Sequence, residues 1–217
     1  MEEKFNLVLF DLDGTIINSA PGIFASFAHA LQKYGKEINV ETGRHVLGPP
    51  LRDSFLRYVP QQDVEDAIAT YREYYIPHGM YEASLYTGVA EMLLTLRKAG
   101  YRLALATSKP EAFARLILQR FGIDVLFDYI GGASFDTSRD TKAQVIEYVL
   151  SQPCFAQLEA VMIGDRDNDM QGAAKCGVPA VGVLYGYGSA EELAPYAPLA
   201  LVQTMQQLQD FLLQHKA

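Results

Sequence analysis

The feature that most constrains this sequence is an alternation of short apolar runs with amphipathic stretches. Apolar runs typical of buried strands cover residues 5–10, 102–106, 129–131, 160–163, 180–184 and 199–202. Helical periodicity fills the intervals, at about 89–99, 108–121, 142–150 and 167–175, and a last helix follows Thr204. The alternation predicts an α/β fold, with a doubly wound, mostly parallel sheet (a Rossmann-like core) and helices on both faces.

A block of helical pattern interrupts this alternation directly after the first strand. Helices are expected at about 21–35, 51–58 and 61–77, with a break at Gly48-Pro49-Pro50. We interpret the block as an inserted all-helical cap domain. The predicted domains are an α/β core of residues 1–15 and 85–217 and a helical cap of residues 16–84.

Composition excludes several classes of protein. The chain has 18 Lys and Arg against 26 Asp and Glu, a net charge of −8, which argues against binding a nucleic acid polymer. Two cysteines are too few for a disulfide framework. Every apolar run is shorter than the roughly 18 residues of a membrane span, and the acidic start does not resemble a signal peptide. We therefore expect a cytoplasmic protein without a membrane partner; the sequence indicates no oligomeric state.

Polar residues follow three of the predicted strands, and a lysine opens a helix between them. These residues are Asp11 and Asp13, Thr107 and Ser108, Asp165 and Asp169, and Lys142. Ligands bind beyond the carboxyl ends of strands in open parallel sheets. We therefore expect these side chains to converge on one site.

Asp11 and Asp13 point to the same side of a continuing strand, because one residue separates them. Their mutual repulsion favours a bound cation or a shared proton. One carboxylate could then act as a nucleophile and the other as a proton donor. The alternative is that Asp-x-Asp-Gly forms only a turn after a strand.

The other polar residues suit a metal and a phosphate. Asp165 and Asp169, together with the first pair, could hold Mg²⁺; the alternative is that Asp165 or Asp167 only caps the following helix or lies in its first turn for the helix dipole. Thr107 and Ser108 could cradle an anion, while Ser108 and Glu111 also match a capping box. Lys142 could neutralise a phosphoryl oxygen or lie on the surface.

Another segment, Gly186-Tyr187-Gly188-Ser189, follows a strand but lacks the third glycine of a dinucleotide-binding loop. We therefore do not predict a dinucleotide site there.

Taken in order, four motifs resemble those of the haloacid dehalogenase-like hydrolases, and within them the phosphoglycolate phosphatase-like group. The motifs are Phe10-Asp11-Leu12-Asp13-Gly14-Thr15, Leu105-Ala106-Thr107-Ser108-Lys109-Pro110, Lys142, and Gly164-Asp165 through Asp169. The resemblance covers essentially the whole chain, including the cap. The third motif departs from the more usual Lys-Pro, since Ala143 follows Lys142.

The resemblance implies a role for each motif residue. Asp11 would form an aspartyl-phosphate, and Asp13 would act as general acid and then base. Mg²⁺ would bind the carboxylates of Asp11 and Asp165 and the backbone carbonyl of Asp13, with Asp169 as a ligand or close neighbour. The phosphoryl group would be held by Thr107, Lys142 and the amides of Leu12 and Ser108.

The resemblance also implies a function, which is Mg²⁺-dependent hydrolysis of a small phosphorylated metabolite. Phosphoglycolate is the first expectation and a nucleoside 5′-monophosphate the alternative. A phosphomutase is a further alternative, and a non-catalytic phosphoacceptor or binding module the last. Asp13 favours a phosphatase over a dehalogenase. We hypothesise that Arg52 contacts the substrate's carboxylate or a second anionic group and that Asn18 and Lys109 border the pocket.

Overall fold

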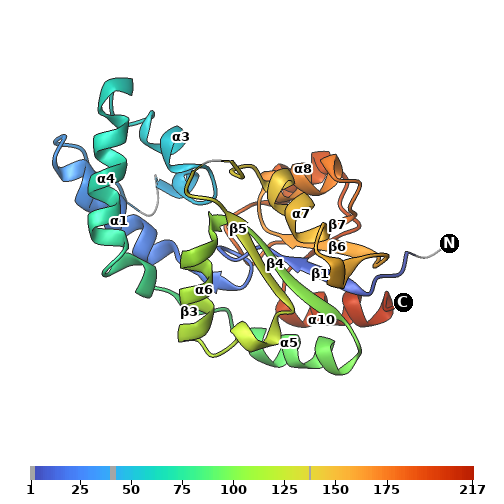
Figure 1. The fold of residues 1–217 in the computed structure, drawn as a ribbon. Helices are drawn as coiled ribbons and strands as arrows, with labels where there is room; N and C mark the ends of the chain where they lie inside the picture. Colours follow the sequence, from blue (N-terminus) through green and yellow to red (C-terminus); the bar gives the residue numbers. More distant parts are fainter. Residues whose placement is uncertain (1–2, 40–42, 137) are drawn as a thin grey trace. The chain divides into compact units, whose positions relative to one another are not determined.

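The computed structural model describes residues 3–39, 43–136 and 138–217 (Figure 1). The chain forms two compact units. We call Met1–Ile17 with Leu85–Ala217 the core unit, and Asn18–Ser84 the helical unit. The helical unit thus begins two residues after the expected start of the cap at residue 16.

The core unit contains a six-stranded parallel sheet in the order β5-β4-β1-β6-β7-β8. Its strands are β1 (Leu7–Phe10), β4 (Arg102–Pro110), β5 (Tyr129–Ala133), β6 (Ala160–Gly164), β7 (Ala180–Val183) and β8 (Ala200–Val202). The predicted parallel α/β fold is confirmed. Because β1 pairs with both β4 and β6, the ends of these three strands are neighbours.

Helices cover both faces of this sheet. They are α5 (Val89–Lys98), α6 (Glu111–Arg120), α7 (Lys142–Leu150), α8 (Asp167–Lys175), α9 (Ala190–Leu193) and α10 (Met205–Gln214). The helices α7 and α8 lie together on one face, and α5 and α10 lie together on the other (Figure 1). Leu7 and Leu9 of β1 join the apolar core beneath α7 and α8, with Val145, Ile146 and Met170 among its members.

A capping box begins α7. The Thr141 hydroxyl accepts a hydrogen bond from the Gln144 amide at 3.3 Å, and the Gln144 side chain accepts one from the Thr141 amide at 3.1 Å. These bonds satisfy backbone donors that a helix start leaves without intrahelical partners. They fix the first residue of the helix, Lys142, beside the ends of the strands.

The predicted capping box of Ser108 and Glu111 is wrong. Strand β4 continues to Pro110, and α6 begins at Glu111 without a side-chain cap. The reason is Pro110, because a residue that precedes proline is pushed away from helical backbone angles, and here that residue is Lys109. Glu111 instead accepts hydrogen bonds from Arg115.

The helical unit contains the three predicted helices, as α1 (Ala20–Gln32), α3 (Leu51–Phe55) and α4 (Val64–Tyr75). Aromatic rings form its core, with Phe27 at 4.5 Å from Phe55 and 5.1 Å from Tyr71 between ring centroids. Strands β2 (Ile17–Asn18) and β3 (Ser84–Leu85) pair where the chain passes between the units. Within the described residues, no helix is both long and apolar enough to cross a bilayer.

Replacing Thr141 with alanine should destabilise the protein by about 1 kcal/mol, because α7 loses its N-cap. The expected fall in melting temperature is about 2–4 °C, measured by differential scanning calorimetry. Ser108→Ala is the matched control, since Ser108 caps no helix, and it should leave the melting temperature unchanged. An equal loss in both variants would contradict this account of the two helix starts.

Candidate active site

Three buried carboxylates meet at the carboxyl edge of the sheet. Asp11 follows β1, Asp165 follows β6, and Asp169 lies in the first turn of α8. Each offers an oxygen within 4.8 Å of the others. Asp11 is 7% exposed, and Asp165 and Asp169 are fully buried. The structure therefore brings together side chains that are more than 150 residues apart in the sequence.

Lys142 bridges two of these carboxylates. Its Nζ lies 2.6 Å from Asp11 Oδ1 and 2.8 Å from Asp169 Oδ1, and it donates to the Ala106 carbonyl at 3.0 Å. Burial opposes the charge of this lysine, but the two carboxylates outweigh burial and raise its pKa. Lys142 therefore stays protonated. A lysine in the first turn is unfavourable for the helix dipole, and this pairing explains its presence there.

A second ion pair joins Lys109 to Asp13. Lys109 Nζ lies 2.6 Å from Asp13 Oδ1, and the two side chains are 7% and 16% exposed. The sequence predicts Lys109 only at the border of the pocket. Its strand-end position beside Thr107 was a possible signal, but nothing in the sequence pairs it with Asp13. The structure thus assigns a different lysine to each member of the Asp11–Asp13 pair.

Asp165 is held at both carboxylate oxygens. The Thr15 hydroxyl donates to Oδ1 at 3.3 Å, and the Tyr187 amide donates to Oδ2 at 2.7 Å. Gly14 has φ +88° and packs against this carboxylate, which a Cβ at Gly14 would approach to 2.1 Å. Sequence reasoning missed Thr15 and Tyr187 as partners, because only the tertiary fold brings them to Asp165.

Both oxygens of Asp169 also have partners. Oδ2 accepts hydrogen bonds from the amides of Asp165 and Arg166, each at 3.1 Å, and Oδ1 faces Lys142. Asp169 therefore fixes the turn between β6 and α8 as well as the ammonium group.

The predicted anion cradle lies at the end of β4. Thr107 is 1% exposed, and its hydroxyl accepts a hydrogen bond from the Lys109 amide at 3.2 Å. Ser108 is half-buried in the same strand. Since β4 pairs with β1 up to Phe10, Thr107 and Ser108 lie on the strand next to the one that leads into Leu12.

Negative charge exceeds positive charge in this cluster. Four carboxylates (Asp11, Asp13, Asp165 and Asp169) face two ammonium groups (Lys109 and Lys142), which leaves two negative charges in excess. Burial, opposed by Lys142 and reinforced by Asp169 and Asp13, raises the pKa of Asp11 to about 6. Burial, with repulsion from Asp169 and Asp11, raises the pKa of Asp165 well above its ordinary value. Buried oxygen donors with this charge fit a hard divalent cation such as Mg²⁺.

Two predicted site residues lie in the helical unit and have partners there. Arg52 on α3 forms an ion pair with Glu65 on α4, and both side chains are more than half exposed. The Asn18 side-chain oxygen accepts a hydrogen bond from the Ala20 amide at 3.2 Å, at the start of α1. Their roles toward a substrate stay predictions.

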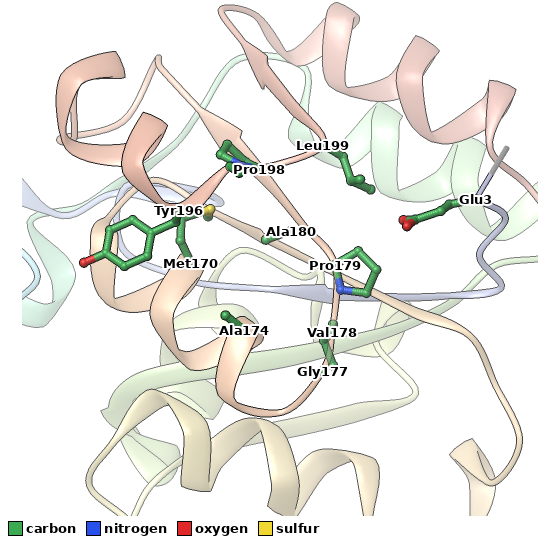
Figure 2. Close-up of a pocket in the computed structure, with 11 residues that line it drawn as sticks. Glu3, Met170, Ala174, Gly177, Val178, Pro179, Ala180, Tyr196, Pro198 and Leu199 are labelled. Atoms are coloured by element: carbon green, nitrogen blue, oxygen red, sulfur yellow. The ribbon is translucent and has the colours of Figure 1, made fainter. Parts of the chain in front are cut away.

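A separate hollow of about 310 Å³ lies beside α8. Its lining includes Met170, Ala174, Pro179, Tyr196 and Leu199 (Figure 2). It contains none of the four carboxylates or two lysines of the acidic cluster. We therefore place the candidate site at the cluster rather than in this hollow.

Comparison with known proteins identifies relatives of this chain. A family model described as haloacid dehalogenase-like hydrolase matches residues 8–183. The tyrosine-protein kinase PtkA of Mycobacterium tuberculosis is 43% identical over 87% of this chain and 65% of that protein, so this chain spans about two thirds of its length. A 5′-nucleotidase of Pseudomonas aeruginosa is 36% identical over 90% of each chain. A phosphoglycolate phosphatase of Colwellia psychrerythraea is 32% identical over 96% of each.

A solved structure shares the same fold. The predicted phosphatase from Clostridium acetobutylicum superimposes with a TM-score of 0.90 at 37% identity, covering 98% of this chain and all of that one. Residues 8–183, which the family model matches, contain all four motifs that resemble those of this family. The family expected from those motifs is therefore confirmed.

Replacing Asp11 with asparagine should stabilise the metal-free protein above pH 6. Its pKa is higher in the folded chain, at about 6, than its ordinary value of 3.8. The folded protein therefore binds the proton more tightly, and ionisation lowers the free energy of unfolding as pH rises between these values. Asparagine stays neutral, so the gain should be about 1–3 kcal/mol at pH 7.5 and should vanish below about pH 4.

The measurement is urea unfolding in EDTA at several pH values. Asp210→Asn, on the exposed face of α10, is the matched control and should change little at any pH. If Asp11→Asn is less stable than the parent at pH 7.5, the claim that burial of the Asp11 charge is unfavourable is contradicted.

Proposed function

This chain belongs to the haloacid dehalogenase-like hydrolases, and we propose that it is a Mg²⁺-dependent phosphatase that hydrolyses a small phosphate monoester. The observation that carries the proposal is the buried cluster at the end of β1, where Asp11 and Asp13 lie with two negative charges in excess. Such a cluster suits a divalent cation and a phosphoryl group together. The relatives named 5′-nucleotidase and phosphoglycolate phosphatase support the same reaction class.

In the proposed first step, an oxygen of Asp11 attacks the phosphorus and the ester P–O bond breaks. Asp13 donates a proton to the departing alkoxide, so the products are an alcohol and an aspartyl-phosphate. In the second step, Asp13 accepts a proton from water, whose oxygen attacks the phosphorus. The bond to Asp11 then breaks, which releases phosphate and restores the carboxylate.

Positive groups and backbone amides would hold the transferring group. Lys142 lies beside the attacking carboxylate and would neutralise a phosphoryl oxygen. The Thr107 hydroxyl and the amides of Leu12 and Ser108 would bind the other oxygens. Positioning and charge neutralisation supply most of the catalysis in phosphoryl transfer.

Mg²⁺ would be held by Asp11, Asp165 and the backbone carbonyl of Asp13. When bound, the cation neutralises charge on the phosphoryl oxygens beside the nucleophile. Asp169 already binds two amides and Lys142. We therefore propose that Asp169 holds Lys142 and the turn after β6 in place and does not bind the cation directly.

For the substrate, we propose phosphoglycolate or a similar small carboxylated monoester. The relative named phosphoglycolate phosphatase supports this choice, and the relative named 5′-nucleotidase supports the alternative of a nucleoside 5′-monophosphate. Because one relative is named tyrosine-protein kinase PtkA, the same assay includes a control for transfer of phosphate from ATP to a tyrosine peptide.

Phosphate release from a panel of monoesters tests the reaction class. The panel contains phosphoglycolate, nucleoside monophosphates, sugar phosphates and an aryl phosphate, each with Mg²⁺ and with EDTA. We expect release that depends on Mg²⁺, with phosphoglycolate hydrolysed fastest. Asp11→Asn should lower kcat at least about 1,000-fold because it lacks the nucleophile, while Asp210→Asn should not.

Three other results would contradict parts of this proposal. Undiminished turnover by Asp11→Asn would exclude the aspartyl-phosphate. Faster release from nucleoside monophosphates would favour the 5′-nucleotidase. If no ester releases phosphate but phosphate moves between positions of a sugar phosphate, the enzyme is a mutase. If phosphate instead moves from ATP to a tyrosine peptide, it is a kinase.

Arg52→Ala tests the proposed contact with a second anionic group. Loss of the guanidinium should raise KM for a carboxylated monoester about tenfold, because a charged hydrogen bond is lost, and should leave an aryl phosphate unaffected. Arg57→Ala, an exposed arginine close by in the sequence, is the matched control. An unchanged substrate profile for Arg52→Ala would refute the contact.

A further inference from the structure

The loop that follows β7 packs directly against the buried carboxylate of Asp165. We call Tyr185–Gly188 the β7 loop. The Tyr187 amide of this loop donates to Asp165 Oδ2 at 2.7 Å, the shortest hydrogen bond that this carboxylate makes to a described residue. The Gly-Tyr-Gly segment, which does not fit a dinucleotide site, therefore has a different partner within the chain.

Two glycines allow this close approach. A Cβ at Gly186 would lie 2.3 Å from the Gly14 carbonyl oxygen and 2.5 Å from Asp165 Cβ. A Cβ at Gly188 would lie 1.9 Å from the Asp165 carbonyl oxygen. These distances are too short for any side chain, and most of the contacted atoms are backbone or stem atoms that cannot rotate away. Glycine is therefore required by the proximity of Asp165.

Tyrosines anchor the β7 loop on either side of Gly186. The Tyr185 hydroxyl donates to the Thr15 carbonyl at 3.2 Å, and its ring packs edge-on against Tyr86 with centroids 5.1 Å apart. The loop is thus attached to the segment after β1, whose Thr15 hydroxyl binds the other oxygen of Asp165.

We infer that the β7 loop is a positioning element that fixes the Asp165 carboxylate in the orientation needed to bind the cation. Within the part of the chain that the structure describes, each oxygen of this carboxylate accepts one hydrogen bond, from Thr15 or from Tyr187, and each carboxylate oxygen has two lone pairs. One lone pair on each oxygen thus stays available to a metal. Partners of this kind orient metal ligands, and their loss commonly weakens metal binding 10–100-fold, as a rough guide.

This inference rests on the proposed function, because it assumes the Mg²⁺ site. The test is Gly186→Ala, whose methyl group must displace Asp165 or the loop. Calorimetric titration of the metal-stripped protein with Mg²⁺ should show at least tenfold weaker binding than the parent. The number and strength of Mn²⁺ sites, measured by electron paramagnetic resonance, should fall in parallel. Neither readout depends on turnover.

Gly182→Ala is the matched control, from the strand that leads into the loop. A Cβ there would lie 2.6 Å from Leu201 Cδ2 and 2.7 Å from Leu193 Cδ1, so it disturbs apolar packing without touching Asp165. It should lower the melting temperature and leave Mg²⁺ affinity unchanged. Equal weakening of Mg²⁺ binding in both variants would overturn the inference, since the effect would then be general.

If Gly186→Ala does not fold, Tyr185→Phe tests whether the β7 loop positions Asp165. It removes only the hydroxyl that ties the loop to Thr15, and Mg²⁺ binding should weaken about threefold; unchanged affinity would overturn the inference.

Mg²⁺ binding by the parent protein distinguishes failure of this inference from failure of the proposed function. A parent that binds no Mg²⁺ contradicts the proposed metal site, whereas Mg²⁺ binding that is equal in the parent and Gly186→Ala contradicts only the role of the loop.

Discussion

The structure of the site depends on negative charge concentrated where water is excluded. Asp11, Asp165 and Asp169 would repel one another strongly in a medium of low polarity. Lys142 offsets part of this repulsion by contacting two of them at 2.6 and 2.8 Å. The remainder is an energetic cost that the rest of the fold must outweigh, and it is visible in the raised pKa values of Asp11 and Asp165. A divalent cation bound among these carboxylates would lower this cost.

Parallel strand order is what forces these charges together. Strands β1 and β6 pair in register from Leu7 with Ala160 to Phe10 with Ile163, so the residues after them emerge side by side. Burial of Leu7, Leu9 and their neighbours under α7 and α8 supplies favourable free energy that a loop alone could not. The acidic cluster is therefore located at the carboxyl edge of the sheet, where polar residues lie at the ends of the neighbouring strands β1, β4 and β6.

The sequence predicts those parts of the structure that local patterns encode. Apolar runs identify all six strands of the sheet, and the charged residues after them identify the acidic cluster. The start of α6 was predicted wrongly, because a capping pattern competes there with Pro110, whose effect on Lys109 is the stronger one. The bonds from Thr15 and Tyr187 to Asp165 have no local signal. They arise only when segments 150 and 22 residues away fold against the same side chain.

The two lysines give two aspartates one residue apart different surroundings, as the proposed division of roles between them requires. Asp11 is 7% exposed and lies among other carboxylates, with Lys142 as its cationic partner. Asp13 has a more accessible side chain and pairs with Lys109, which comes from the end of β4. Neighbouring acids can divide nucleophilic and proton-transfer roles only if their surroundings differ. That difference comes from the fold, because β4 and α7 bring a separate ammonium group to each carboxylate.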